Sequence, residues 1–430
     1  MVGTDGAFPD LDLGTYLGRG GQRLLVDTRD ALYHTAILAQ SGAGKSSLVA
    51  RFIEELVVST HARVVVLDAG GDLRRCSALR KRAEPGKDAT DKKKQEYREF
   101  RQFGEHWQGV GRTHVVGPAA APRWQAPGHS HSLSIEFSRL PLDLKREVLK
   151  LNWPADATEC EALRAADQLW REGSAEIAAT PSELVDVNAW KVLTGPMGGS
   201  WPDRSQAYTR LGVEMQRINK WGIWLEPGQT SGWDLRAPDA MREQLTIVDL
   251  PSMGARECRL FVVSMVLQVL FDRAKDEWEE AQAQRPKGKV RLPTLVVLDE
   301  AHHWAPAEGG DAQVRALRSC LLEIAAEGRK YGLWLIVATQ RPSKVAPGLL
   351  SECENACLLR LQSPVEHTAA ADTWGVPLET IQRTAHFEPG QGLLLGRWVA
   401  APVAFHAARP RTAQAGGNLR DEWRRPRQRP

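Results

Sequence analysis

The segment that most constrains the fold of this chain is residues 34–48, HTAILAQSGAGKSSL. The apolar run from Ala36 to Ala39 predicts a buried strand, the small residues after it predict a tight loop, and the apolar spacing from Leu48 onward predicts a helix. Strand, glycine-bearing loop and helix in this order build a phosphate cradle, because backbone N–H groups and the positive end of the helix dipole face the same anion. The segment therefore predicts a polyphosphate site.

Each position of this loop has a predicted role. Gly42 and Gly44 let the backbone turn around the phosphates, Lys45 reaches the β- and γ-phosphates, and the Ser46 hydroxyl binds Mg²⁺. The full pattern G-x-x-x-x-G-K-[ST] has glycine where this chain has Ala39, a small steric change that leaves the assignment in place. The alternative is a glycine-rich turn without a ligand. The predicted nucleotide-binding residues of the loop are Ser41, Gly42, Ala43, Gly44, Lys45, Ser46 and Ser47.

Two later strand-like segments end in acidic residues. RVVVLDAGGDL predicts a buried strand that ends at Asp68, and TLVVLDEAHHW predicts one that ends at Asp299 and Glu300. Because ligands bind at the carboxyl ends of parallel strands, we expect Asp299 to hold Mg²⁺ and Glu300 to polarise the attacking water. The alternative is a pair of surface acids. Asp68 is expected to line the nucleotide site, and its alternative role is to cap a turn.

The segment that follows supplies a polar residue at the same edge. LWLIVATQRPSKV predicts a strand that delivers Gln340 beside Asp299, where an amide can sense the γ-phosphate. The helix predicted before this strand ends at Arg329 and Lys330. Cations at a helix C-terminus also have a simpler explanation in the helix dipole.

Composition bounds the class of protein. The chain has 430 residues, of which 42% are hydrophobic and 25% are charged, and its formal net charge is +3. These values are ordinary for a globular protein. No apolar run approaches the ~18 residues of a membrane span, and no signal-peptide pattern is present, so we expect a cytoplasmic protein without membrane segments. The six cysteines are scattered and are expected to be reduced.

The patterns predict an α/β protein with a mainly parallel sheet flanked by helices. The sheet and its helices are expected from 34–73 and 244–405, with short strands in 1–33, a mostly helical insertion in 74–243 and a basic disordered tail in 406–430. The charged run from Arg74 to Lys94 predicts a surface helix, a loop and the start of another helix. It fits a solvated surface or a patch that faces DNA.

The ordered set AQSGAGKSS, VVVLDAGGDL, LTIVDLPSMG, LVVLDEAHHW, EGRKYG and IVATQRPSKV resembles the HerA/FtsK superfamily of ring-forming DNA-pumping ATPases, and the HerA branch in particular. The resemblance implies a RecA-like P-loop NTPase core and a homo-hexamer with ATP and Mg²⁺ between subunits. It also implies that DNA passes through the central hole without sequence preference. We therefore expect an ATPase that couples hydrolysis to DNA translocation.

The resemblance also assigns roles to single residues. It implies that Lys45 and Ser46 are the phosphate-loop pair and that Asp68 is the acid of the second strand. The predicted metal and water residues are Asp299 and Glu300, the sensor is Gln340, and the arginine that reaches the neighbour's nucleotide is Arg329. Two departures stand out. The β-barrel that precedes the ATPase in archaeal relatives is reduced here to the strands of 1–33, and AGGDL replaces a Pro-His-Gly-Glu type segment, which leaves the role of Asp72 open.

The expected function is an ATP-driven hexameric DNA translocase or helicase that acts with a separately encoded nuclease or effector in DNA processing or anti-phage defence. The alternative is a nucleotide-gated ring scaffold that assembles and activates an effector with little translocation. A coupling ATPase of secretion or conjugation is a third option, disfavoured by the lack of membrane segments. Residues 299–302 spell DEAH, the signature of another helicase superfamily, but no second core follows. His302 and His303 are expected to start a helix and to bind no metal.

Overall fold

The computed structural model describes residues 10–76, 78–80, 82–86, 90–109, 113–118, 129–172, 179–195, 204–225, 244–283 and 291–413. The strands are β1 (Asp10–Tyr16), β2 (Arg23–Asp27), β3 (Thr35–Leu38), β4 (Arg63–Asp68), β5 (Thr113–Gly117), β6 (His129–Ser132), β7 (Leu245–Asp249), β8 (Thr294–Leu298), β9 (Leu333–Thr339), β10 (Asn355–Leu359), β11 (Gln391–Leu395) and β12 (Val403–Ala407). The α-helices are α1 (Lys45–Ser59), α2 (Asp91–Gly109), α3 (Leu142–Val148), α4 (Ala157–Arg171), α5 (Val187–Leu193), α6 (Ser205–Asn219), α7 (Arg256–Ala283), α8 (Ala312–Tyr331), α9 (Pro347–Ser351), α10 (Pro364–Trp374) and α11 (Leu378–Gln382). Short 3₁₀ helices are η1 (Phe137–Arg139), η2 (Glu183–Val185), η3 (Leu250–Met253), η4 (Ala301–His303), η5 (Pro342–Lys344) and η6 (Arg383–His386).

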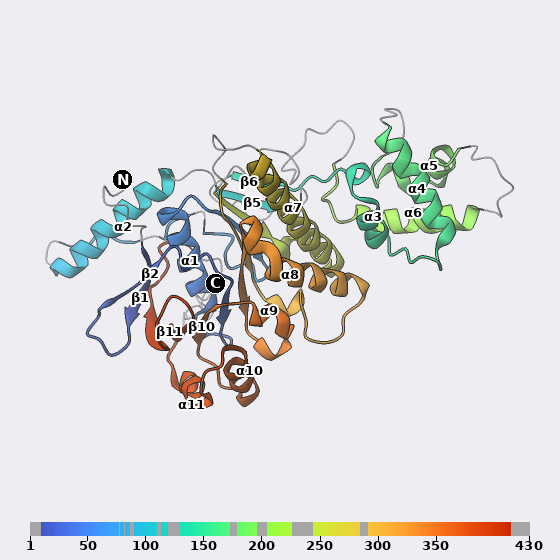
Figure 1. The fold of residues 1–430 in the computed structure, drawn as a ribbon. Coiled ribbons are helices and arrows are strands. Elements are labelled where there is room, and N and C mark those ends of the chain that lie inside the picture. Colours follow the sequence, from blue (N-terminus) through green and yellow to red (C-terminus); the bar gives the residue numbers. More distant parts are fainter. Residues whose placement is uncertain are drawn as a thin grey trace, which may run out of the picture.

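All the described strands form one twelve-stranded sheet in the order β2-β1-β12-β11-β10-β3-β9-β8-β4-β7-β5-β6. Figure 1 labels β1 and β2 near one edge of this sheet and β5 and β6 near the other. From β10 to β6 each neighbouring pair is parallel. The strands from β2 to β11 pair antiparallel, and β11 also pairs antiparallel with β10. The predicted α/β fold with a mainly parallel sheet is therefore confirmed.

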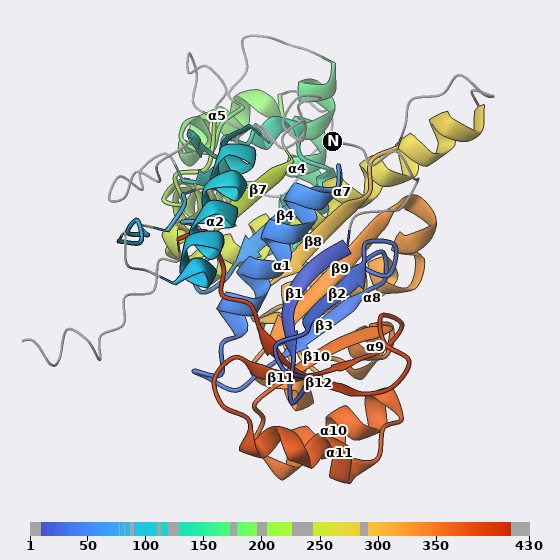
Figure 2. The ribbon, with the colours of Figure 1, turned by 90° about the vertical axis from the view of Figure 1, so that its left-hand side faces the viewer.

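Helices cover both faces of the parallel strands, with α1 on one face and α7 and α8 on the other (Figure 2). Side chains of a strand alternate between the two faces. In β4, Val64 and Val66 belong to the apolar cluster under α1, whereas Val65 and Leu67 belong to the cluster under α7 and α8. Burial on both faces explains why these strands read as continuous apolar runs.

The helices α3 to α6 form a group that lies away from the sheet, beyond α7 (Figure 1). These helices lie within the segment predicted as a helical insertion. That segment also contains β5 and β6, which extend the parallel sheet beside β7. The two strands β1 and β2 likewise join the edge of the same sheet through β12. No described helix has the length and hydrophobicity that a bilayer span requires.

The surface helix predicted directly after Arg74 is wrong for the described residues. Leu79 instead forms a β-bridge with Thr412, and the backbone of Arg80 bonds to that of Arg411. This segment is extended because it pairs with the chain beyond β12. The predicted tail of 406–430 accordingly starts with described residues that are ordered, and its part from 414 onward lies outside the described residues.

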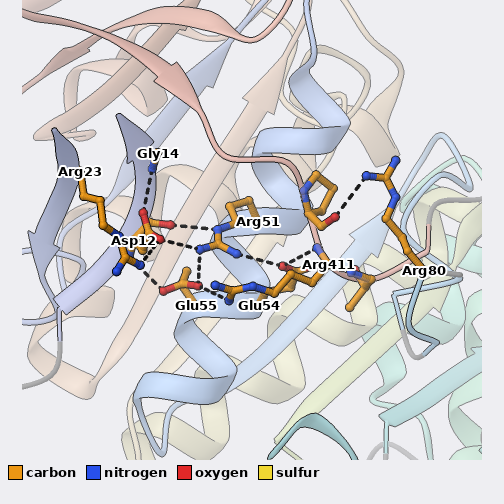
Figure 3. Close-up of polar contacts among 10 residues, drawn as sticks. Asp12, Gly14, Arg23, Arg51, Glu54, Glu55, Arg80 and Arg411 are labelled. Atoms are coloured by element: carbon orange, nitrogen blue, oxygen red, sulfur yellow. Dashed lines mark hydrogen bonds and ion pairs between the residues drawn. The ribbon is translucent and has the colours of Figure 1, made fainter. Parts of the chain in front are cut away.

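Residues 408–413, which we call the C-terminal strap, are held against α1 by buried charged groups (Figure 3). Glu54 is 0% exposed and accepts hydrogen bonds from the N–H groups of Arg411 and Thr412, at 3.0 and 2.7 Å, and from the Thr412 hydroxyl at 2.7 Å. Arg51 pairs with Glu55 at 2.8 Å and with Asp12 of β1 at 3.2 Å. The helix that follows the predicted phosphate loop is thus joined to both ends of the described chain.

Candidate nucleotide-binding site

The predicted phosphate loop lies between β3 and α1, at the carboxyl end of a strand within the parallel part of the sheet. Gly42 and Gly44 have φ angles of +76° and +103°, in the left-handed region that favours glycine. A β-carbon on Gly44 would lie 3.3 Å from the backbone nitrogen of Gly390, closer than an ordinary contact. These glycines therefore let the loop curve before α1 begins at Lys45.

The other loop residues fit the same arrangement. Ala39 is fully buried among the apolar side chains under α1, so its methyl group packs into the core. The carbonyl of Ala43 accepts a hydrogen bond from Gly390 N–H at 2.9 Å. Ser41 is exposed at the tip of the loop, and Ser47 is half-buried. The alanine in place of the first glycine is thus accommodated by the core.

Lys45 contacts two carboxylates that come from a distant part of the chain. Its Nζ atom donates to Asp299 Oδ1 and lies 3.1 Å from Glu300 Oε1. Burial opposes the charge on Lys45, but the two carboxylates outweigh it and raise the pKa of the ammonium group above its ordinary value. The fold therefore brings together residues of the two strand ends that the sequence singled out.

Oxygen donors of the kind that Mg²⁺ prefers surround the start of α1. Ser46 Oγ donates to Asp72 Oδ2 at 2.9 Å, and Asp299 Oδ2 accepts from Gly70 N–H at 3.2 Å. A β-carbon on Gly70 would lie 3.5 Å from Asp299 Oδ2 and 3.9 Å from Asp72 Oδ2, so the two carboxylates flank this glycine. One hydroxyl and two carboxylates fit a magnesium ion that takes most of its other ligands from phosphates and water.

Glu300 has a φ angle of +49°, which is uncommon for a residue with a β-carbon. Gln340 Nε2 donates to Glu300 Oε1 at 2.6 Å. His302 Nδ1 lies 3.3 Å from Glu300 Oε2 and 3.0 Å from Thr339 Oγ1. Burial favours the neutral acid, but the charge on Lys45 outweighs it and lowers the pKa of Glu300. Burial lowers the pKa of His302 to about 4, so the imidazole is neutral at pH 7.

Asp68 lies at the end of β4 with a fully buried side chain. Its carboxylate accepts hydrogen bonds from the N–H groups of Gly71, Leu73 and Arg74 at 2.8, 2.9 and 3.0 Å. Burial, and then the charge on Asp299, raise the pKa of Asp68 to about 7. These contacts match the turn-capping role that the sequence left open, and the turn carries Asp72 to Ser46.

Arg329 lies at the amino ends of the parallel strands, opposite the carboxyl ends where Lys45 lies. It belongs to the last turn of α8, which precedes β9, whereas Gln340 follows the end of β9. The seven residues of β9 span roughly 20 Å. Arg329 pairs with Glu354 at 3.3 Å, and its guanidinium lies 4.7 Å from the ring centroid of Tyr33. The structure therefore brings Lys45, Asp299, Glu300 and Gln340 together, but not Arg329 within the same chain.

Two residues of this site were missed by the sequence patterns. Asp72 follows the glycines after Asp68, and only its bond to Ser46 reveals its place. His302 was expected to start a helix, which it does in η4, but its ring also turns toward Glu300 and Thr339. The sequence feature that could have indicated both residues is that each follows an acidic strand end by only a few positions.

Comparisons with known proteins agree with this geometry. A family model described as the central domain of helicase HerA matches residues 11–178. The DNA double-strand break repair helicase HerA of Pyrococcus furiosus is 24% identical over 385 residues, which cover 85% of this chain and 62% of that protein. HerA of Sulfurisphaera tokodaii is 23% identical over 197 residues, covering 42% of this chain and 35% of that protein. The chain thus spans less than two thirds of the length of these relatives.

Solved structures show the same fold. VirB4 of Thermoanaerobacter pseudethanolicus has a TM-score of 0.56 and 17% identity, covering 94% of this chain and 97% of that chain. The bacterial conjugative coupling protein TrwB has a TM-score of 0.56 and 11% identity, covering 94% and 91%. The phosphate loop, the acidic strand ends and the sheet define a RecA-like P-loop fold. Within that fold class, the chain is similar in sequence to helicase HerA and similar in structure to VirB4 and TrwB.

Proposed function

We propose that this protein hydrolyses ATP to move DNA, as a translocase or helicase that works as a homo-hexamer. The observation that carries the proposal is the contact of Lys45 with Asp299 and Glu300. This contact supports the proposal because it joins a phosphate-binding lysine to an acid pair suited to Mg²⁺ and water activation. The curated relatives named as DNA repair helicases point to DNA as the substrate. A TrwB structure in complex with ADP and Mg²⁺, which shares the fold at a TM-score of 0.54, supports these cofactors.

Different residues of the site have different roles in the proposed hydrolysis. The loop N–H groups and Lys45 would hold the phosphates, and Ser46, Asp299 and Asp72 would hold Mg²⁺. Bound Mg²⁺ supplies neutralisation of phosphate charge. Lys45 would exchange its carboxylate contacts for phosphate oxygens, which frees Glu300 to accept a proton from the attacking water. Gln340 keeps Glu300 in place through Oε1.

Arg329 completes the site from a neighbouring copy in this proposal. The phosphate loop lies at the carboxyl ends of the parallel strands and Arg329 lies at their amino ends. A head-to-tail contact between copies can therefore bring them together, and repetition of that contact can close a ring. An arginine delivered in this way is worth about 10³-fold or more in rate. Hydrolysis would then depend on assembly.

The mutation Arg329→Ala should therefore abolish most hydrolysis and leave ATP binding intact. The expected loss is about 10³-fold in kcat, with an unchanged dissociation constant for a fluorescent ATP analogue. Turnover of this variant at the wild-type rate would remove Arg329 from the site.

DNA-stimulated ATPase activity, together with movement along DNA in a single-molecule assay, tests the function as a whole. Stimulation with movement supports the translocase. ATP-dependent assembly without movement would contradict it and favour the nucleotide-gated scaffold. We include in the proposal a cytoplasmic place of action and a separately encoded nuclease or effector, in DNA processing or anti-phage defence, which co-purification with DNA-processing proteins of the same cell would test.

A further inference from the structure

A second arginine contacts the same aromatic ring as Arg329, at the amino ends of the parallel strands and thus opposite Lys45. The guanidinium of Arg397 lies 4.9 Å from the ring centroid of Tyr33, and that of Arg329 lies 4.7 Å from the same centroid. Tyr33 precedes β3, Arg329 ends α8 and Arg397 follows β11. Three separate segments thus converge on one aromatic ring. We call Arg329 and Arg397 the arginine pair.

The place of Arg397 is fixed by buried groups behind it. Its N–H donates to Asn355 Oδ1 at 2.9 Å, and Asn355 is itself fully buried, with Nδ2 donating to the carbonyl of Asp30 at 2.7 Å. The preceding residue, Gly396, has a φ of +100°. A β-carbon on Gly396 would lie 2.1 Å from the carbonyl oxygen of Glu354. Only glycine fits there, so the turn presents Arg397 in one position.

The arginine pair has more positive charge than its surroundings balance. Among the described residues, the one carboxylate recorded against either guanidinium is that of Glu354, at 3.3 Å from Arg329. Arg329 is 55% exposed and Arg397 is also exposed, so both can meet a group from outside the chain. Stacking on Tyr33 restricts both side chains and offsets part of their repulsion. Two planar guanidiniums held this way suit a phosphate group, which each can bind with two hydrogen bonds.

We propose that Arg397 acts together with Arg329 on the triphosphate bound at the phosphate loop of a second copy of this chain, and that Tyr33 positions both arginines. The inference rests on the proposed function, because it assigns a residue to the same site between copies. The source of the phosphate is the neighbour's nucleotide and not the DNA backbone. Arg397 is thus a catalytic residue of the composite site, and Tyr33 is a positioning residue.

The first test compares single variants at saturating ATP. R397A should lower kcat at least about tenfold while the affinity for a fluorescent ATP analogue and the assembled mass stay unchanged. R397K keeps the charge without the planar fork and should fall between R397A and the wild type. Y33F keeps the ring and should resemble the wild type, whereas Y33L should lose activity. R383A, which removes an exposed arginine of η6, is the matched control and should change none of these values.

The second test asks from which copy Arg397 acts. R397A chains mixed with K45A chains should recover turnover above that of either variant alone, because some interfaces then join an intact phosphate loop to an intact arginine pair. Turnover by the wild type establishes the proposed function independently of this test. Given that turnover, a wild-type kcat in R397A, or the absence of recovery in the mixture, overturns the inference. Loss of DNA affinity in R397A with an unchanged DNA-free kcat would also overturn it, since it would assign the arginine to DNA.

Discussion

At Glu300 the backbone takes a conformation that costs about 1 kcal/mol or more for a residue with a β-carbon. The contacts of its side chain explain what this conformation achieves. Oε1 faces Gln340 and Lys45, and Oε2 faces His302. If Lys45 leaves for a phosphate, Gln340 still donates to Oε1, and His302, which is hydrogen-bonded to Thr339, still lies beside Oε2. The strained residue is therefore the one that our account uses as the base.

Replacement of His302 tests this contact. Asparagine can place an amide nitrogen near the position of Nδ1, whereas glutamine places it near Nε2. We expect H302N to keep most of the activity, while H302Q and H302A lose about 2- to 10-fold in kcat, the net value of the neutral hydrogen bond that fixes the ring on Thr339. The KM for ATP should change little. Steady-state kinetics, with H303A as the control, would measure these changes in kcat and KM. Equal losses of kcat in H302N and H302Q would contradict a role of the Nδ1 atom of His302.

The buried carboxylate of Asp68 makes stability depend on pH. Because its pKa in the folded chain is about 7, against 3.8 ordinarily, the folded state binds more protons between these values. The stability that this proton contributes is present below pH 3.8 and is lost as the pH rises to about 7. The free energy of unfolding of D68N relative to wild type should therefore rise over this range, by at most about 4 kcal/mol. Urea unfolding at several pH values measures it, and a flat or falling difference would refute the burial argument.

At the scale of elements, α1 links the phosphate loop to the rest of the fold. Its first residue is Lys45, and Arg51, Glu54 and Glu55, further along the helix, contact β1 and the C-terminal strap. A buried carboxylate with several donors is stable only while those donors remain. The strap therefore contributes to the position of the helix that begins at the candidate nucleotide site.

The mutation Thr412→Val tests the strap with little change of shape. It removes one hydroxyl donor from the fully buried Glu54. We expect a loss of about 1–3 kcal/mol in unfolding free energy, visible as a lower Tm. Thr209→Val removes an exposed hydroxyl of α6 and should stay within about 0.5 kcal/mol of wild type. Equal Tm values for the two variants would show that the strap hydroxyl adds nothing.

Much of the core was predictable because apolar strands end in chemically distinctive residues. The runs before Lys45, Asp299 and Gln340 fix both the strands and the edge at which these side chains meet. The antiparallel edge was less predictable, since β1 joins the core only through β12, far along the chain. Contacts such as that of His302 with Glu300 depend on one left-handed residue, which no periodicity indicates.

At the scale of the whole molecule, the phosphate loop lies at the carboxyl ends of the parallel strands and the arginine pair lies at their amino ends. A single copy cannot bring its own arginine pair to its own phosphate loop, because the length of the parallel strands, which are buried on both faces, separates them. In the proposed mechanism, hydrolysis therefore requires assembly, while nucleotide binding needs only the residues of one phosphate loop. Binding and hydrolysis should separate as the protein dissociates.

The most direct test is the rate of ATP hydrolysis per chain, measured across chain concentrations alongside the mass of the particles in Mg²⁺ and ATP. We predict that chains of 47.6 kDa bind nucleotide without hydrolysing it, and that turnover appears together with a particle of six chains. Full turnover per chain by a 47.6 kDa monomer would contradict the account.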